Sequence, residues 1–187
     1  MTRRFSSEPV DSVRLASWLD SARRAPSAGF SQGVHFVVCT GSSLDAFWRI
    51  TGAGDWFVEA SRGVLDAPVI VVPLADSGAY TTRYAEPDKA GHGLEIAANW
   101  PVPFWLTDAA MATQNLLLLV EAAGLGALFF GIFRGESEFL DHIGAPASAH
   151  ALGAVAIGHR SPNDAPSGSP RRRTRRDAAD VIHWGTW

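Results

Sequence analysis

The stretch from Thr107 to Gly124, TDAAMATQNLLLLVEAAG, constrains the fold more than any other part of the chain. It contains no proline and is rich in Ala and Leu, which have high helix propensity. Thr107 or Asp108 can cap its first turn, and Gly124 can adopt the left-handed conformation that ends a helix. Because this helix is apolar on nearly every side, we expect it to be buried against a sheet and also against a second subunit.

Size and composition indicate a single domain, residues 1–187, with a real core. The chain has 187 residues, and its 47% hydrophobic content suits a globular protein with an extra apolar interface. The net charge of −3 gives no reason to expect nucleic acid or an anionic membrane as a partner. Gln114, Asn115 and Glu121 interrupt the long helix, so it is not expected to span a membrane.

The N-terminal sequence and the cysteine content bear on location and on metal binding. MTRRFSSEPV lacks the apolar segment of a secretory signal, so we expect a cytoplasmic protein. Cys39 is the only cysteine, which excludes an intrachain disulfide and a cysteine-based metal site. Its position in a predicted strand favours a buried, inert thiol. The six histidines are scattered, so no metal site is expected.

Helical and strand-like segments alternate along the chain, which predicts an α+β or α/β layered domain. A first helix is expected from a cap at Asp11 or Ser12 to Arg24, with Val13, Ala16, Leu19 and Ala22 on one apolar face. Further helices are expected at 44–50, 54–59, 107–124 and 137–143, and strands at 35–40, 69–72, 128–133 and 152–157.

Two segments between these elements have a special character. The apolar run 69–72, which Pro73 is expected to end, is typical of a strand buried on both faces. Residues 76–105 are rich in Gly and Pro, and we expect an irregular segment that is functional or mobile. Residues 161–170 read as a flexible loop before the C-terminal tail.

Common catalytic motifs are absent, and two features remain as candidates for a site. The chain contains no serine nucleophile elbow, phosphate-binding P-loop, dinucleotide fingerprint or zinc-protease motif. The first candidate is a loop of small residues between a helix and a strand, whose amides can approach a ligand closely. An ordinary helix stop is the alternative. The loop contains Pro26, Ser27, Ala28, Gly29 and Gln32.

The second candidate is the group of arginines at the two ends of the chain. RRRTRR at 171–176, together with Arg3 and Arg4, suits a phosphate, because guanidinium groups form forked, charge-assisted hydrogen bonds. A solvated basic run or an electrostatic arm for nucleic acid is the alternative. Without interleaved aromatic residues or a groove-reading helix, the nucleic-acid interpretation is the weaker one.

Taken together, four segments resemble the nitroreductase family of FMN-dependent oxidoreductases. They span nearly the whole chain and are RRFSSEPV, ARRAPSAGFSQGVHFVV, DAAMATQNLLLLVEAAGLGALFFGIF and AIGHRSP…RRRTRRDAADVIHW. The resemblance implies an α+β fold with a mixed sheet flanked by helices. It also implies an intertwined homodimer with the central helix buried and FMN at the subunit interface. The C-terminal arm, 160–187, is then expected to pack on the partner subunit.

The resemblance also implies which residues hold the flavin. An early basic residue touches it, a small-residue loop lies along its ring and ribityl chain, amides after the central helix approach N5, and two cations near the C-terminus hold the phosphate. The matching positions are Arg3, then Pro26, Ser27, Ala28, Gly29 and Gln32, then Phe130 and Gly131, and finally Arg173 and Arg175.

Three departures from the family pattern leave an alternative open. The family's N-terminal Arg-Ser falls before or on Met1, Phe30 stands in place of an Asn, and Gly33 with Val34 replaces Pro-Trp. Arg4, Arg171 or Arg172 can replace the lost cation. The alternatives are weak FMN binding, a deazaflavin cofactor, or a non-enzymatic protein that binds or sequesters flavin.

The activity that the resemblance implies is a ping-pong hydride transfer from NAD(P)H to a small electrophilic or aromatic acceptor. The flavin performs the chemistry, so no catalytic side chain is named. Aromatic residues of the irregular segment and the start of the helix are expected to form the substrate wall, or alternatively to pack the dimer. They are Tyr80, Tyr84, Trp100, Phe104 and Trp105.

Overall fold

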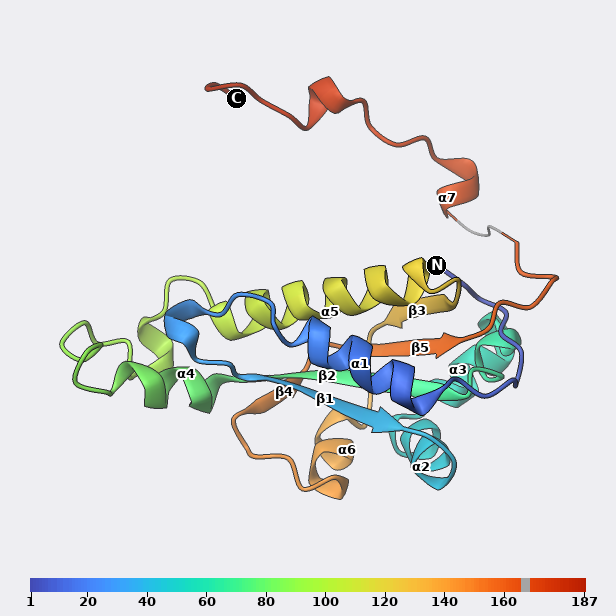
Figure 1. Cartoon of the computed structure of the whole chain (residues 1–187), viewed down its shortest axis with the longest axis horizontal. Helices are drawn as coiled ribbons and strands as arrows, with labels where there is room; N and C mark the ends of the chain where they lie inside the picture. Colours follow the sequence, from blue (N-terminus) through green and yellow to red (C-terminus); the bar gives the residue numbers. More distant parts are fainter. Residues whose placement is uncertain (166–168) are drawn as a thin grey trace.

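One antiparallel sheet lies at the centre of the α+β fold, with helices on both faces (Figure 1). The computed structural model describes residues 1–165 and 169–187. Four strands follow the order β1-β2-β5-β3, and β4 pairs with β2 beyond the end of β5. Every strand pair in this part of the chain is antiparallel, so the sheet described here is not the mixed sheet that was expected. The strands are β1 (Val34–Cys39), β2 (Val69–Asp76), β3 (Gly126–Phe130), β4 (Ala149–Ala151) and β5 (Ala154–Gly158).

The central strand β2 contributes to two separate cores, as a strand buried on both faces should. Val69 and Val71 pack against α1 (Ser12–Ala22) and α5 (Phe104–Ala122). Their cluster includes Leu116 and Val120 of α5. Ile70 and Val72 pack on the opposite face. There they meet Phe47, Phe57 and Phe139, which come from α2 (Ser42–Thr51), α3 (Ala53–Ala60) and α6 (Glu136–His142).

Pro73 does not end β2, contrary to the prediction from the sequence. The strand runs on to Asp76, and Pro73 faces Phe36 of β1. On the other edge of β2, β5 pairs with residues 69–71 and β4 pairs with residues 74–76. Pro73 therefore lies where the neighbouring strand changes, and there its missing N–H removes no ladder hydrogen bond.

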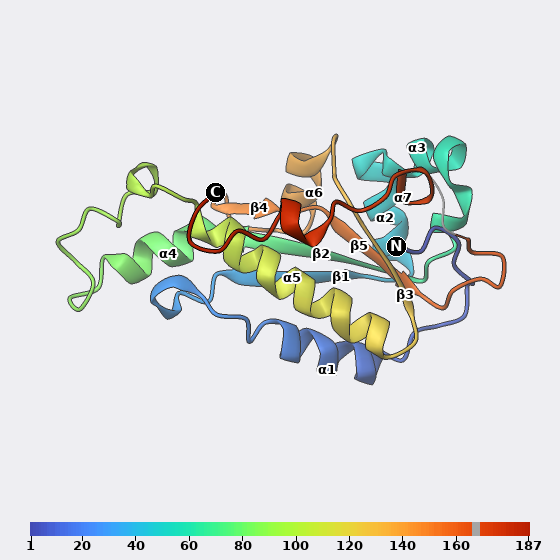
Figure 2. The ribbon, with the colours of Figure 1, turned by 90° about the horizontal axis from the view of Figure 1, so that it is seen from above.

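Helix α1 begins as predicted, but its buried face is different. The Asp11 side chain accepts hydrogen bonds from the amides of Val13 and Arg14, which caps the helix. Val13 is exposed, whereas Leu15 and Ala22 are buried against α5 and the sheet (Figure 2). The predicted apolar face was right for Leu19 and Ala22, which pack in the core, and wrong for Val13 and Ala16, which are exposed; Leu15 and Trp18 take their place.

Helix α5 begins at Phe104, three residues before the predicted start, so neither Thr107 nor Asp108 caps it. Its end is as predicted: Gly124 has φ +79° and follows the last turn. Only part of its surface is buried within one chain. Leu118 is 59% exposed, and it shares one face of the helix with Met111.

Several connections differ from the sequence-based expectation. The segment 76–105 is not wholly irregular, since it contains α4 (Ser77–Tyr84) and a short 3-10 turn, Ala97–Asn99. The short strand β4 was not predicted. The predicted flexible loop 161–170 falls partly on residues 166–168, which lie outside the described residues. After α7 (Ser169–Arg172) the tail extends away from the sheet (Figure 1). None of the helices described has the length and apolarity needed to cross a membrane.

Candidate cofactor site

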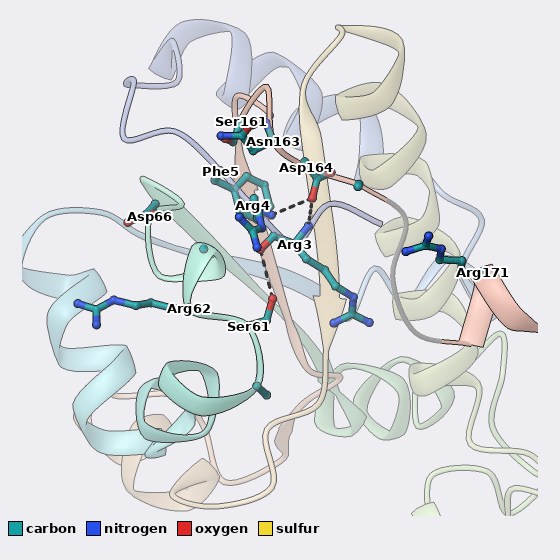
Figure 3. Close-up of a pocket in the computed structure, with 13 residues that line it drawn as sticks. Arg3, Arg4, Phe5, Ser61, Arg62, Asp66, Ser161, Asn163, Asp164 and Arg171 are labelled. Carbon is teal, nitrogen blue, oxygen red and sulfur yellow. Dashed lines mark hydrogen bonds between the residues drawn. The ribbon is translucent and has the colours of Figure 1, made fainter.

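An arginine-lined cavity opens where the N-terminal segment, the turn after α3 and the segment after β5 meet (Figure 3). Its volume is about 600 Å³. Arg3, Arg4, Arg62 and Arg171 line it together with two carboxylates, Asp66 and Asp164. The lining therefore carries an excess of positive charge, which suits an anionic group such as a phosphate.

The N-terminal segment at this cavity is held by its backbone. The amides of Arg3 and Arg4 donate to Oδ1 of Asp164 at 2.9 and 3.0 Å, and Phe5 is buried and pairs with Arg160. The hydroxyl of Ser61 donates to the carbonyl of Arg3. In the described part of the chain, neither Arg3 nor Arg4 forms a side-chain ion pair. Their guanidinium groups are therefore available to a ligand.

The small-residue loop predicted from the sequence has an unusual backbone. Gly29, Phe30 and Gln32 all have positive φ, at +62°, +57° and +53°. Two of these are not glycine, and left-handed non-glycine residues cluster at functional sites. The amide of Gln32 donates to Oγ of Ser27 at 3.0 Å, which closes the loop on itself. Residues 26–32 thus form a defined structure, not a simple helix stop.

Three side chains from other elements hold this loop in place. The amide of Ala28 donates to Oδ2 of Asp108 at 2.9 Å, and the Nε of Arg83 donates to the carbonyl of Gly29 at 2.9 Å. The ring of Tyr84 lies so close that a Cβ at Gly29 would come within 2.7 Å of it. Glycine is therefore required at this position by packing as well as by its backbone conformation.

A second cavity, of about 400 Å³, contains the predicted flavin-contacting residues Phe130 and Gly131. Trp56 and Phe57 of α3 line it as well. The ring of Phe133, which is 94% exposed, lies against Gly131, where an added Cβ would come within 2.9 Å of it. Residues of α3 line both cavities, since Ala60 at the end of the helix lines the arginine-lined cavity and Trp56 and Phe57 line the second.

The predicted substrate-wall aromatics form one cluster between α4 and the start of α5. Trp100 contacts Tyr80, Tyr84, Phe104 and Trp105 with centroid distances between 4.7 and 5.9 Å. Tyr80 and Trp100 are buried, so their rings support the fold and do not face solvent. Phe104 is the member with a large exposed surface, and it can still reach a ligand.

A single chain does not bring all the predicted cofactor residues together. The loop 26–32 lies at one end of the molecule and the N-terminal segment at the other, in both views (Figures 1 and 2). Arg173 and Arg175 lie on the exposed tail after α7. The sequence analysis missed Arg62, Arg83 and the role of Asp108, because an isolated arginine or aspartate gives no motif.

Other candidates for chemistry are excluded within the described residues. Cys39 is buried, and burial raises the pKa of its thiol to about 11, so it is an inert side chain, as predicted. No group of three or more His, Cys, Asp or Glu side chains in residues 1–165 and 169–187 is placed to hold a metal ion.

The structure defines an α+β protein with an arginine-lined cavity, and comparison with known proteins identifies its family. The model described as the nitroreductase family matches residues 1–159, so the chain belongs to the nitroreductase family. A protein of Archaeoglobus fulgidus, described as a candidate NADH dehydrogenase/NAD(P)H nitroreductase, is 22% identical over 160 residues. These cover 84% of this chain and 75% of that protein.

Solved structures show the same fold. The nitroreductase CinD from Lactococcus lactis, in complex with nicotinic acid, superposes with a TM-score of 0.76 at 20% identity, covering 100% of this chain and 95% of that one. An oxidoreductase containing FMN superposes with a TM-score of 0.74 at 22% identity, covering 100% and 87%. The expected α+β nitroreductase fold is therefore confirmed.

The residues present are compatible with FMN. The excess of guanidinium groups at the larger cavity suits the phosphate, whereas the ring of Tyr84 fills the space beside Gly29 and the exposed ring of Phe133 fills the space beside Gly131.

Proposed function

We propose that the chain is an FMN-dependent oxidoreductase that reduces small electrophilic or aromatic substrates with NAD(P)H by a ping-pong hydride transfer. The observation that carries the proposal is that residues of α3 line both the arginine-lined cavity and the cavity that contains Gly131, in a member of the nitroreductase family. Two of the similar proteins, a candidate NADH dehydrogenase/NAD(P)H nitroreductase and an oxidoreductase containing FMN, support the choice of donor and of cofactor.

In this proposal the chain holds the cofactor at three points. Arg3 and Arg4, with Arg173 and Arg175 of the tail, balance the charge of the phosphate. Loop 26–32 would border the ring and ribityl chain, and the amide of Gly131 would donate toward the N5 side of the ring. When bound, FMN supplies the hydride chemistry, whereas the protein supplies binding, orientation and exclusion of water. A guanidinium or amide near the pyrimidine end stabilises negative charge that develops on reduction.

The proposed site needs a second copy of the chain. Loop 26–32 and the N-terminal segment lie at opposite ends of the molecule, so we infer that one copy cannot place both on the same flavin (Figure 1). The exposed apolar face of α5, with Leu118 and Met111, is a surface that a symmetric partner can bury. We propose that two copies associate through α5, and that the arm 160–187 packs on the partner subunit.

Phe104 and Trp105 are the proposed substrate-contacting residues among the aromatic cluster. Phe104 is exposed at the start of α5, close to loop 26–32, which Asp108 of the same helix contacts. Tyr80, Tyr84 and Trp100 support them from below through edge-to-face contacts. An aromatic acceptor could stack on such a surface.

Titration of the apoprotein with FMN, followed by steady-state kinetics, tests the proposal. We expect stoichiometric quenching of FMN fluorescence, and parallel double-reciprocal plots when a quinone or nitroaromatic acceptor is varied at several NADPH concentrations. Intersecting plots would contradict the ping-pong order. Failure to bind FMN would contradict the proposal as a whole.

A flavin-sequestering protein of the same fold is the second candidate. The observation that favours it is the ring of Phe133 lying against Gly131, together with the exposed Phe30 on the cofactor loop. Either ring could cover the reactive edge of a bound flavin. A protein of this kind would hold FMN with the same arginines and would not be reduced by NADH or NADPH.

A further inference from the structure

We propose that Asp108 is a positioning residue that holds loop 26–32 in the conformation that receives the flavin, an inference that rests on the proposed function. Asp108 belongs to the second turn of α5 and is 2% exposed. Its Oδ2 accepts from the amide of Ala28 at 2.9 Å and from the hydroxyl of Tyr80 at 2.7 Å. Its Oδ1 lies 3.3 Å from Oγ1 of Thr107.

The burial of this carboxylate requires a reason. No described ion pair includes Asp108, and a buried carboxylate is costly unless hydrogen bonds satisfy it. Neighbouring positions that also face inward, such as Ala109 and Ala112, are apolar. A carboxylate at 108 is therefore explained by the two donors it binds, one of which belongs to the loop.

The loop depends on this contact because of where it is made. Ala28 is the first residue of the short 3-10 turn that contains the left-handed Gly29 and Phe30. The hydrogen bond from the Ala28 amide to Asp108, which joins residues 80 positions apart in the sequence, holds the first residue of this left-handed turn in place. An apolar side chain at 108 would leave the amide of Ala28 unsatisfied, and the loop could relieve that cost only by moving.

Asp108 also links the loop to α4, through its hydrogen bond with Tyr80. Tyr80 comes from α4, and the next turn of α4 carries Arg83, which donates to the carbonyl of Gly29. Asp108 thus ties the loop to α5 directly and to α4 through Tyr80. Loss of Asp108 leaves Arg83 as the remaining side-chain hydrogen bond between the loop and these helices in the described structure.

The test compares Asp108→Leu with Asp108→Asn and with the matched control Thr113→Val. In Asp108→Asn the side-chain amide oxygen can take the place of Oδ2 and accept from both the Ala28 amide and the Tyr80 hydroxyl. This variant should therefore keep the conformation of the loop. Thr113 is a buried polar residue of the same helix, and within the described residues its hydroxyl donates a hydrogen bond only to the carbonyl of Ala109. Hydrogen–deuterium exchange of the apoprotein reports on peptides covering 26–33, and FMN fluorescence titration reports on affinity.

For Asp108→Leu we expect exchange in 26–33 about tenfold faster and an FMN Kd raised about tenfold, since a buried donor loses its partner. Asp108→Asn should stay within about threefold of the wild type in both measurements. Thr113→Val should lower the Tm but leave both the exchange rate in 26–33 and the Kd for FMN unchanged. If Asp108→Leu does not fold, the shorter Asp108→Ser takes its place in the same comparison.

Equal exchange in 26–33 for Asp108→Leu and Thr113→Val would overturn the proposal, as would faster exchange with an unchanged Kd for FMN. Exchange in the apoprotein does not require the cofactor, so it separates this proposal from the proposed function. A wild-type protein that does not bind FMN would refute the proposed function, and with it the claim that the loop receives a flavin.

Discussion

The hydroxyl of Tyr80 donates a 2.7 Å hydrogen bond to Oδ2 of Asp108, and this buried pair joins α4 to α5 beneath the loop 26–32. Burial, and then the hydrogen bond with Asp108, raises the pKa of the Tyr80 hydroxyl well above its ordinary value. Tyr80 therefore keeps its hydroxyl proton, and donates a hydrogen bond to Asp108, at a pH near 10 at which an ordinary tyrosine ionises.

Tyr80→Phe should lower the free energy of unfolding by about 1–2 kcal/mol, because Asp108 loses one of its two strong donors while packing is preserved. Urea denaturation measures the change. Tyr84→Phe is the matched control, since no side-chain hydrogen bond of the Tyr84 hydroxyl is found in the described part of the chain. Equal losses in the two variants would show that the Tyr80–Asp108 bond contributes nothing specific.

Leu118→Glu should yield a folded monomer. Leu118 is 59% exposed within one chain, so a carboxylate there is compatible with the fold, but it places charge in the proposed α5 interface. Sedimentation velocity and far-UV circular dichroism measure assembly and folding. Val13→Glu, at an exposed apolar position on α1, should remain dimeric. A dimeric Leu118→Glu protein would place the interface elsewhere.

Arg173→Ala combined with Arg175→Ala should reduce FMN retention at least about tenfold, because the phosphate loses two charge-assisted partners. The flavin-to-protein ratio after gel filtration gives the result. Arg23→Ala with Arg24→Ala removes the same charge from α1, where both side chains pair with Asp20, and should retain FMN. Unchanged flavin content in the tail variant would remove these two residues from the phosphate site.

Cys39 should resist alkylation in the native protein at pH 8 and react on unfolding, because its thiolate form is suppressed by burial. Burial raises the pKa of Cys39 from 9.0 to about 11, so the folded state retains a proton that the unfolded state loses between these values. The stability contributed by the buried thiol is therefore present below pH 9 and is lost as the pH rises toward 11. Rapid native alkylation, or no stability difference from Cys39→Ala across this range, would contradict the prediction.

The parts of the fold that the sequence predicted are those set by local chemistry. The Asp11 cap, the end of α5 near Gly124 and the buried run in β2 follow from capping, left-handed glycine and unbroken apolar residues. The start of α5 was missed because Pro103 and the aromatic residues after it do not resemble a capped start. The passage of β2 through Pro73 depends on where β5 gives way to β4, which no local pattern shows.

The candidate site could be predicted only as residue types and loops. The loop 26–32 and the terminal arginines stood out by composition, and the family resemblance supplied their order. The sequence did not show that Asp108 holds Ala28, because a contact across 80 residues leaves no periodic pattern. It also placed Tyr80 and Trp100 on a substrate wall, whereas both are buried in the aromatic cluster that supports the start of α5.

The central claim is that this protein holds FMN and accepts hydride from a nicotinamide donor. The most direct measurement is the visible absorption spectrum of the purified protein, reconstituted with FMN and gel-filtered, before and after anaerobic addition of NADPH or NADH. The account predicts a bound flavin spectrum that bleaches on addition of the donor and returns when an aromatic acceptor is added. A bound flavin that stays oxidised with both donors would contradict it.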